Sequence, residues 1–297
     1  MRQTHRNRSR GTSRAELRRP AAAAAAIALA AAAPAGAQQA TWTPAPTQPS
    51  AGHLVTRFTL DLARFDAAPD DNGDRAEITD LRLRTTLSYG ITGSLSATLV
   101  APVVHRDADS DGPGPDPDEE FGLGDVTLSL KKRVWQNDFG PVDTARLALF
   151  AGAQLPTGED AFSSDSVDPH LGATFMLISG RHGFNQALTW TFTTGDTNTP
   201  LRPGDTLSDA LLFDSAYLYR LAPAEYGSDF VASWYAVAEL NGSWETSGDT
   251  ELILSPGVLY EATSWAFEAG FRVPVYQDVD ERGEMEWSVT AGLRFLF

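Results

Sequence analysis

Apolar and polar residues alternate along most of the chain from Leu54 onward, in segments of about ten residues separated by turn-forming residues. Between Val126 and Leu130, for example, apolar residues take the even positions, whereas Lys131 and Arg133 continue the odd, polar series. A period of two is typical of a β-strand with one apolar and one polar face. A helical period would place these charges on the same face as the leucines, so the pattern predicts an all-β fold.

The alternating segments recur about twelve times, and short and long connections follow one another along the chain. An even number of strands, with tight turns at one end and longer polar loops at the other, predicts a transmembrane antiparallel up-and-down β-barrel. The soluble alternatives are a β-sandwich and a lipocalin-like barrel. The expected strands cover approximately 53–65, 76–89, 94–105, 121–135, 145–156, 169–179, 184–193, 208–222, 229–240, 251–260, 265–277 and 285–297.

Aromatic residues favour the membrane barrel over the soluble alternatives, because they gather at the strand ends next to the short turns. A ring of aromatic side chains at the membrane interface has this placement. The chain ends on Phe297, as bacterial outer-membrane barrels usually do, so we expect the barrel-assembly machinery to bind this end. The residues expected in the ring are Tyr89, Phe184, Tyr219, Tyr260, Trp265 and Phe297.

The N-terminus has the features of a secretory signal peptide. An arginine-rich segment precedes an apolar run from Ala21 to Ala33, and Pro34 and small residues follow. The apolar run is shorter than the roughly 20 residues that cross a bilayer as a helix. We therefore expect cleavage near Ala37, a flexible Pro-rich leader over 38–52, and the barrel over 53–297, in the outer membrane of a Gram-negative bacterium.

Composition narrows the possible partners further. The chain has 39 acidic and 23 basic residues, for a formal net charge of -16, and contains no cysteine. Such acidity argues against a nucleic-acid partner, and the lack of cysteine excludes disulfides, zinc–thiolate sites and thiol nucleophiles. Most of the acidic residues fall in the long polar connections. We therefore expect an acidic outer rim beside membrane lipid and lipopolysaccharide, where divalent ions bridge to anionic groups.

Four sequence runs appear in an order that resembles a known family. They are GLGDVTLSLKKRVW from Gly122, LFAGAQLPTGED from Leu149, LSPGVLY from Leu254 and AFEAGFRVPVYQD from Ala266. This order resembles the outer-membrane transporters grouped as the MetA-pathway of phenol degradation. The resemblance covers most of the chain from Gly122 to Phe297 and is weaker before it. It implies an outer-membrane barrel that transports aromatic or other hydrophobic compounds.

The polar face of the strands supplies the candidate functional residues, because in a membrane barrel this face lines the lumen. The basic residues of this face include Arg82 and Arg84, which we expect to shape solute selectivity together with Lys131, Arg133 and Arg294. Twelve strands enclose more space than eight, whose interior side chains just fill, and less than a porin. The inward charges are Arg57, Arg82, Arg84, Lys131, Arg133, Arg220, Arg272 and Arg294, against Asp61, Asp125, Asp214, Glu239, Glu268 and Glu286.

One acidic segment matches the first half of a calcium-binding loop. Asp107, Asp109 and Asp111 alternate before Gly112, and Asp118 takes the twelfth position, where glutamate is usual. Several prolines follow Gly112 and no helices flank the segment, so a solvated acidic loop is the competing interpretation. No other cofactor is expected, and no histidine pair has metal-ligand spacing.

These features predict a channel or transporter for passive uptake of small molecules. One alternative is a closed structural barrel whose inward charges neutralise one another. Another is an outer-membrane enzyme, which no nucleophile motif supports. The class of solute stays open at this point. The charged lumen favours small polar or amphipathic molecules, whereas the resemblance implies aromatic or hydrophobic ones.

Overall fold

The computed structural model describes residues 38–67, 76–110, 118–227 and 231–297. The predicted signal peptide, residues 1–37, lies outside these ranges. The described residues form thirteen strands: β1 (Leu54–Asp66), β2 (Ala76–Thr92), β3 (Leu95–Ser110), β4 (Asp118–Leu123), β5 (Val126–Asp138), β6 (Thr144–Leu155), β7 (Asp168–Ser179), β8 (His182–Thr191), β9 (Ala210–Ala222), β10 (Ala232–Glu245), β11 (Thr250–Ala262), β12 (Trp265–Asp278) and β13 (Glu284–Leu296).

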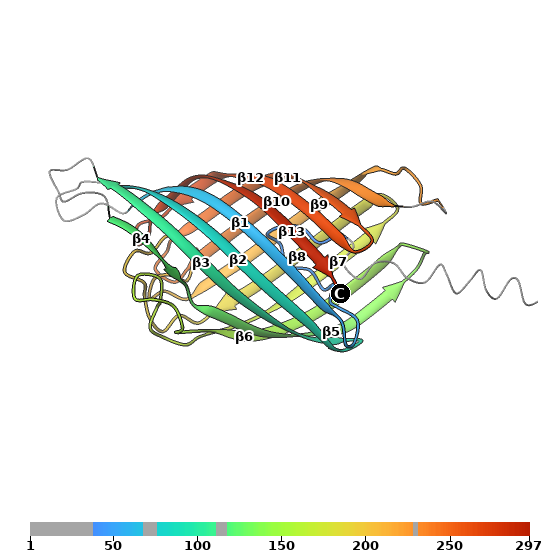
Figure 1. The fold of residues 1–297 in the computed structure, drawn as a ribbon, viewed down its shortest axis with the longest axis horizontal. Coiled ribbons are helices and arrows are strands. Elements are labelled where there is room, and N and C mark those ends of the chain that lie inside the picture. Colours follow the sequence, from blue (N-terminus) through green and yellow to red (C-terminus); the bar gives the residue numbers. More distant parts are fainter. Residues whose placement is uncertain (1–37, 68–75, 111–117, 228–230) are drawn as a thin grey trace, which may run out of the picture. The chain divides into compact units, whose positions relative to one another are not determined.

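The strands form one closed antiparallel barrel (Figure 1). Each strand pairs with its neighbours in the sequence, and β1 pairs with both β2 and β13, which closes the sheet. Strands β4 and β5 both pair with β3 and are separated only by Gly124 and Asp125, so together they occupy one position in the barrel. The barrel therefore has twelve strand positions, as the alternation predicts.

The two faces of the sheet differ as expected for a membrane barrel. On β1, Thr59 and Asp61 are buried inside the barrel, while Phe58 and Leu60, which alternate with them, are exposed on its outer surface. Outward apolar residues continue around the barrel, for example Leu128. Within the described ranges, no helix is long and apolar enough to cross a membrane. A closed sheet satisfies its backbone hydrogen bonds internally, so it can present this apolar surface to lipid.

Glu286, which we expected inside the barrel, lies outside it, and so does Tyr276, whose place in the alternation predicts the same inward position. Bulges change the alternation at both residues. The register of β1 and β13 shifts between Arg64 and Phe65, and Glu286 is exposed beside Arg64, with a 3.0 Å ion pair. A second shift in the pairing of β11 with β12 leaves Tyr276 half exposed. An extra residue in one strand sends every later side chain to the opposite face. Neither bulge is visible in the hydrophobic pattern.

The connections at the long-loop end differ from the sequence prediction in two places. We expected a connection over 106–120, but β3 continues to Ser110 and β4 begins at Asp118. We expected a polar loop over 241–250, but β10 continues to Glu245 and β11 begins at Thr250, so only residues 246–249 form the turn. Two other long connections, residues 156–167 and 192–209, fold into the mouth of the barrel. Phe162 of the first and Leu201 of the second are buried, Leu201 in a cluster with Phe65.

Candidate functional site

The segment before β1 lies inside the barrel. We call residues 38–50 the plug segment, whose backbone can be followed in Figure 1. Nearly all of its residues are buried or half-buried. The sequence led us to expect a flexible leader here, because the segment is rich in proline and has no alternation. It instead follows the barrel wall, whose side chains supply the hydrogen bonds that an extended Pro-rich chain cannot make with itself.

Glu239 of β10 is the main anchor of the plug segment. Its Oε1 accepts hydrogen bonds from the backbone N–H groups of Thr41 (2.9 Å) and Trp42 (3.2 Å). Its Oε2 accepts from the N–H groups of Trp42 (3.0 Å) and Thr43 (2.7 Å), and from the Thr43 hydroxyl (2.8 Å). One buried carboxylate thus holds three consecutive residues against the wall.

Other wall residues bind the carbonyl groups of the plug segment. Lys131 of β5 donates to the carbonyls of Ala45 (2.8 Å) and Thr47 (2.6 Å). Thr174 of β7 donates to the Pro44 carbonyl at 2.8 Å. Three further wall residues donate to carbonyls of the plug segment: Asn185 to residue 38, Arg294 to residue 39 and Arg57 to residue 41. The plug segment is therefore hydrogen-bonded on several sides of the barrel.

Trp42 lies between two arginines of the wall. The guanidinium carbon of Arg84, on β2, is 4.6 Å from the centre of the Trp42 ring, and that of Arg272, on β12, is 4.2 Å from it. Both distances are within the range of a cation–π interaction, which contributes about 0.5–2 kcal/mol. The plug segment is thus attached to the basic part of the lumen by an aromatic side chain.

Arg84 and Arg272 belong to a larger group that we call the arginine cluster, defined as Arg82, Arg84, Arg106, Arg202 and Arg272. Two carboxylates neutralise part of it. Asp80 lies 3.0 Å from Arg202 and 3.5 Å from both Arg82 and Arg106, and Asp61 lies 3.5 Å from Arg202. Within the described ranges, Arg84 and Arg272 have no ion-pair partner. The cluster therefore leaves positive charge in the lumen.

Two cavities adjoin the arginine cluster. The first measures about 240 Å³ and is lined by Arg82, Arg84 and Arg106 together with Pro102 and Phe162. The second measures about 290 Å³ and lies between the plug segment and the wall, with Trp42, Arg84, Arg202 and Arg272 among its lining residues. Both are at or below the lower end of the range of about 300–1,000 Å³ found for ligand pockets. Arg84 lines both of them.

The connection 156–167 closes part of the outer mouth through Asp125, which lies in the break between β4 and β5. The Asp125 carboxylate accepts hydrogen bonds from the N–H groups of Thr157 (3.0 Å), Gly158 (2.9 Å) and Ser164 (3.0 Å). It also accepts one from the Ser163 hydroxyl at 2.9 Å. Asp125 is the aspartate of the run GLGDVTLSLKKRVW, and Thr157 and Gly158 belong to the run LFAGAQLPTGED. Asp125 therefore joins two of the four runs on which the family resemblance depends.

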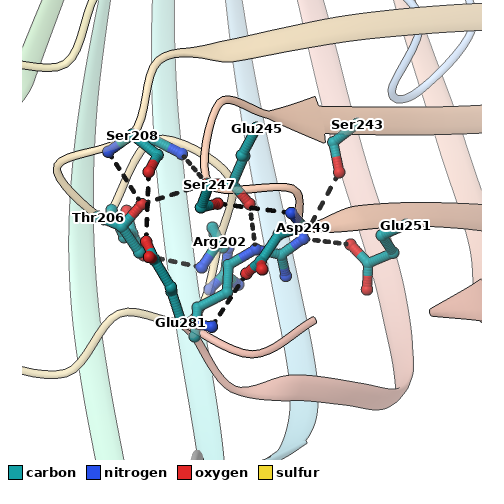
Figure 2. A network of polar contacts seen from close by, with 12 residues as sticks. Arg202, Thr206, Ser208, Ser243, Glu245, Ser247, Asp249, Glu251 and Glu281 are labelled. Carbon is teal, nitrogen blue, oxygen red and sulfur yellow. Dashed lines mark hydrogen bonds and ion pairs between the residues drawn. The ribbon is translucent and has the colours of Figure 1, made fainter. Parts of the chain in front are cut away.

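The connection 192–209 is held by a second polar network at the outer mouth (Figure 2). Arg282 forms ion pairs with Glu245 (2.8 Å) and Glu251 (3.4 Å), and Glu245 in turn accepts from Gly204 N–H and the Thr206 hydroxyl, both at 3.4 Å. Burial lowers the pKa of Arg282, but the carboxylates of Glu251 and Glu245 outweigh it and raise that pKa above its ordinary value. Arg282 therefore stays charged.

Comparison with known proteins gives this barrel its family. The family model for the MetA-pathway of phenol degradation matches residues 75–285. The chain belongs to this family. No curated protein matches the chain.

One solved structure shows the same fold, and two others give lower scores. An outer-membrane channel from Pseudomonas putida F1 superposes with a TM-score of 0.55 at 11% identity, over 88% of this chain and 99% of that one. The monoaromatic hydrocarbon channel CymD gives a TM-score of 0.44 at 9% identity, over 84% of this chain and 89% of that one. The β domain of the Bordetella autotransporter BrkA gives 0.43 at 14% identity, over 84% of this chain and 100% of that one.

For this family member, the structure places most of the predicted luminal residues inside the barrel. Glu268 pairs with Arg57 (2.5 Å) and Arg294 (3.2 Å), and Asp214 accepts from Asn241 at 2.9 Å. Arg133 instead lies at the short-turn end, where it donates to the Gly93 carbonyl. Glu286 lies on the outer surface, as described above. The others with inward positions are Arg82, Arg84, Asp125, Lys131, Arg220, Glu239 and Arg272.

The four aspartates of the predicted calcium loop are only partly described. Asp107 and Asp109 lie on β3, opposite Thr79 and Glu77 of β2, while Asp118 begins β4. Asp111 lies outside the described residues. Among the described residues, no group of three or more acidic or histidine side chains is placed to hold a metal ion. A calcium ion at this loop stays a prediction.

Several residues of the site could not be identified from the alternation. Trp42 was placed in the leader, and Arg202 and Arg106 in polar loops, whereas Arg202 reaches down into the lumen and Arg106 lies buried on β3. Asp80 shares the parity of Arg82 and was identifiable by the same rule. For Trp42 the only signal was a single aromatic residue in a segment otherwise made of small and polar residues.

Proposed function

We propose that this protein is a passive outer-membrane channel for small molecules, in which the plug segment closes the lumen at rest. The observation that carries the proposal is that the lumen holds a removable part of the chain. The plug segment is held by hydrogen bonds and cation–π contacts, precedes the first strand, and takes no part in closing the barrel. The barrel can therefore remain intact while the plug segment moves.

The lining of the lumen supports small amphipathic solutes. The two cavities suit molecules of about one ring, given their volumes. Apolar side chains such as Pro102 and Phe162 share the first cavity with arginines, so the site offers both apolar contact and hydrogen-bond donors. This combination accommodates a ring with a polar substituent, which reconciles the charged lumen with the aromatic compounds that the family resemblance implies.

A closed structural barrel is the second candidate, and the buried ion pairs inside the barrel favour it. Arg57 and Arg294 share Glu268, and Arg282 is held between Glu245 and Glu251. Breaking such buried pairs costs about 3–5 kcal/mol, so they brace the wall firmly. These pairs lie on the wall and at the outer mouth, however, and they hold the barrel together whether or not the plug segment moves.

We infer no catalytic step. Ser129 Oγ and His170 Nε2 are 2.9 Å apart inside the barrel, which is the geometry of a nucleophile and a base. Within the described ranges, no carboxylate hydrogen-bonds to the other ring nitrogen of His170, so nothing orients the ring as an activated serine requires. We interpret the pair as a wall contact that spans Gly152, which separates the two residues across β6.

The membrane partners follow from the outer surface. Phe297 is 68% exposed and is paired through its backbone with Leu54, at the seam where the barrel closes. We propose that the barrel-assembly machinery binds this end, and that the acidic outer loops contact lipopolysaccharide through divalent ions. The channel needs no cofactor for passive movement of solute.

Liposome swelling tests the proposed function. Purified protein is reconstituted into liposomes, which are diluted into isotonic solutions of small solutes that the bilayer itself excludes, such as glycine and arabinose. The full mature chain should give slow swelling, and a variant with the plug segment deleted should give fast swelling. Equal and negligible swelling for both, with folding shown by heat-modifiable gel migration, would favour the closed structural barrel.

A further inference from the structure

The two arginines that contact Trp42 have unused hydrogen-bonding capacity. The indole ring offers Arg84 and Arg272 a π face, but its only polar group is a donor, so it cannot accept from a guanidinium. Within the described ranges, Arg84 makes no hydrogen bond, and the buried Nε of Arg272 has no partner. Both arginines are half-buried, and a buried donor such as this Nε is costly without an acceptor, which indicates that the site is incomplete with Trp42 alone.

The neighbouring arginines add to this deficit. Asp80 and Asp61 pair with Arg202, and Asp80 also with Arg82 and Arg106, yet the Nε atoms of Arg82 and Arg106 remain without partners in the described part of the chain. The cavities adjoin these donors, and Arg84 borders both. Each cavity also has two carboxylates in its lining, Asp125 and Asp205 in the first and Asp214 and Glu251 in the second, against three arginines. The site therefore presents several N–H donors and a small excess of positive charge to a space the size of one ring.

We propose that the arginine cluster binds a single-ring aromatic carboxylate, which takes the place of the Trp42 indole between Arg84 and Arg272. This inference rests on the proposed function and names the class of solute. The ring of the ligand stacks on the guanidinium planes, and its carboxylate accepts hydrogen bonds from the unpartnered N–H groups. Binding releases Trp42, and with it the middle of the plug segment.

Both parts of the ligand are needed for this exchange. Trp42 is tethered to the site by the bonds of its neighbours to Glu239, so it competes at a high effective concentration, of the order of millimolar for short tethers. A neutral aromatic molecule offers only the π face that Trp42 already supplies. A carboxylate without a ring gives up the contact with two guanidinium planes. An aromatic carboxylate supplies both, and its hydrogen bonds to arginine are charge-assisted.

Isothermal titration calorimetry of the purified, detergent-solubilised mature chain tests the proposal with three probes. These are benzoate, cyclohexanecarboxylate, which lacks the π face, and benzyl alcohol, which lacks the charge. We expect benzoate to bind about tenfold more tightly than either of the others, in line with the contribution of a cation–π contact or a charge-assisted hydrogen bond. Equal affinity for benzoate and cyclohexanecarboxylate, or no benzoate binding, would overturn the proposal.

Matched variants locate the binding site. Arg84→Gln and Arg272→Gln should each weaken benzoate binding about tenfold or more, whereas Arg64→Gln removes an equivalent charge from the outer surface and should leave it unchanged. Trp42→Ala removes the competitor without altering the wall, so benzoate should bind more tightly, again by about tenfold. This last variant keeps the proposal testable if an arginine variant does not fold. Unchanged affinity in Trp42→Ala would show that benzoate does not take the place of the indole.

Release of the plug segment has its own readout. Because the chain contains no cysteine, Ala45→Cys creates a single thiol at a buried position of the plug segment. Benzoate should speed its reaction with a maleimide at least fivefold, and benzyl alcohol should not. Liposome swelling on the same preparation separates the two proposals. Swelling without any effect of benzoate contradicts only the aromatic carboxylate, whereas benzoate binding without flux in the plug-deleted variant contradicts the channel.

Discussion

The Glu239 anchor allows the strength of plug binding to be predicted. Glu239→Gln preserves the size of the side chain and one acceptor oxygen, but replaces the other oxygen by an amide NH2 that cannot accept. With the NH2 in the place of Oε2, the N–H of Thr43 loses its acceptor at 2.7 Å and the N–H of Trp42 loses its shorter bond at 3.0 Å. Two donors of the plug segment then face a donor of the wall.

The expected effect follows from these two bonds. Each of these lost hydrogen bonds weakens plug binding by about 1–2 kcal/mol, so losing two weakens it by about 2–4 kcal/mol. At about 1.4 kcal/mol per factor of ten, the released fraction rises roughly 30-fold to several-hundredfold. The barrel strands should be unaffected, because Glu239 makes its hydrogen bonds to the plug segment.

Hydrogen exchange measured by mass spectrometry tests this prediction on the detergent-solubilised protein. Peptides covering residues 38–50 should exchange at least about 30-fold faster in Glu239→Gln, while strand peptides keep their protection. Asp214→Asn is the matched control: Asp214 is also an inward carboxylate, but it binds Asn241 and not the plug segment. Unchanged exchange of residues 38–50 in Glu239→Gln would refute the anchoring role of this carboxylate.

Three further predictions concern the outer mouth and the wall. Asp125→Asn should destabilise the connection 156–167 by about 2–4 kcal/mol, since its carboxylate serves several donors there, and limited proteolysis should cut that connection earlier than in the parent. Arg202→Gln removes the ion pairs to two inward aspartates and should raise hydrogen exchange over 192–209 without changing exchange of the plug segment. Gly152→Ala places a Cβ against the backbone oxygen of Leu128 on β5 and should destabilise the barrel by about 1–3 kcal/mol. The temperature of heat modification should therefore fall, and an unchanged temperature would contradict this close packing.

The alternation of the sequence was sufficient to predict the barrel. Strand positions, their antiparallel order and the inward side of residues such as Arg82 and Glu239 all follow from a period of two, because lipid on one side and a polar lumen on the other reverse the environment at every residue. The prediction fails where one residue is inserted. Glu286 is the unpaired residue of one bulge and Tyr276 lies beyond another, and a bulge depends on the pairing of two strands rather than on the pattern of one.

The plug segment shows a different limit of prediction from sequence. Its proline-rich composition is typical of a flexible leader, and nothing in residues 38–50 alone indicates a fixed position. Its conformation is set by partners far away in the chain, such as Glu239, Lys131 and Arg272. The alternation identifies these partners as inward charges, but it does not show what they bind. A charged residue that holds a segment of the same chain occupies the same position in the alternation as one that lines an open pore.

Single-channel recording in planar bilayers tests the central claim most directly. The full mature chain and a variant lacking residues 38–50 are compared, with heat-modifiable gel migration showing that both are folded. If the plug segment closes the pore, the deletion should give stepwise conductance well above that of the full chain. Two folded proteins with the same negligible conductance would show that the lumen is closed by its wall and outer connections, which would contradict the account.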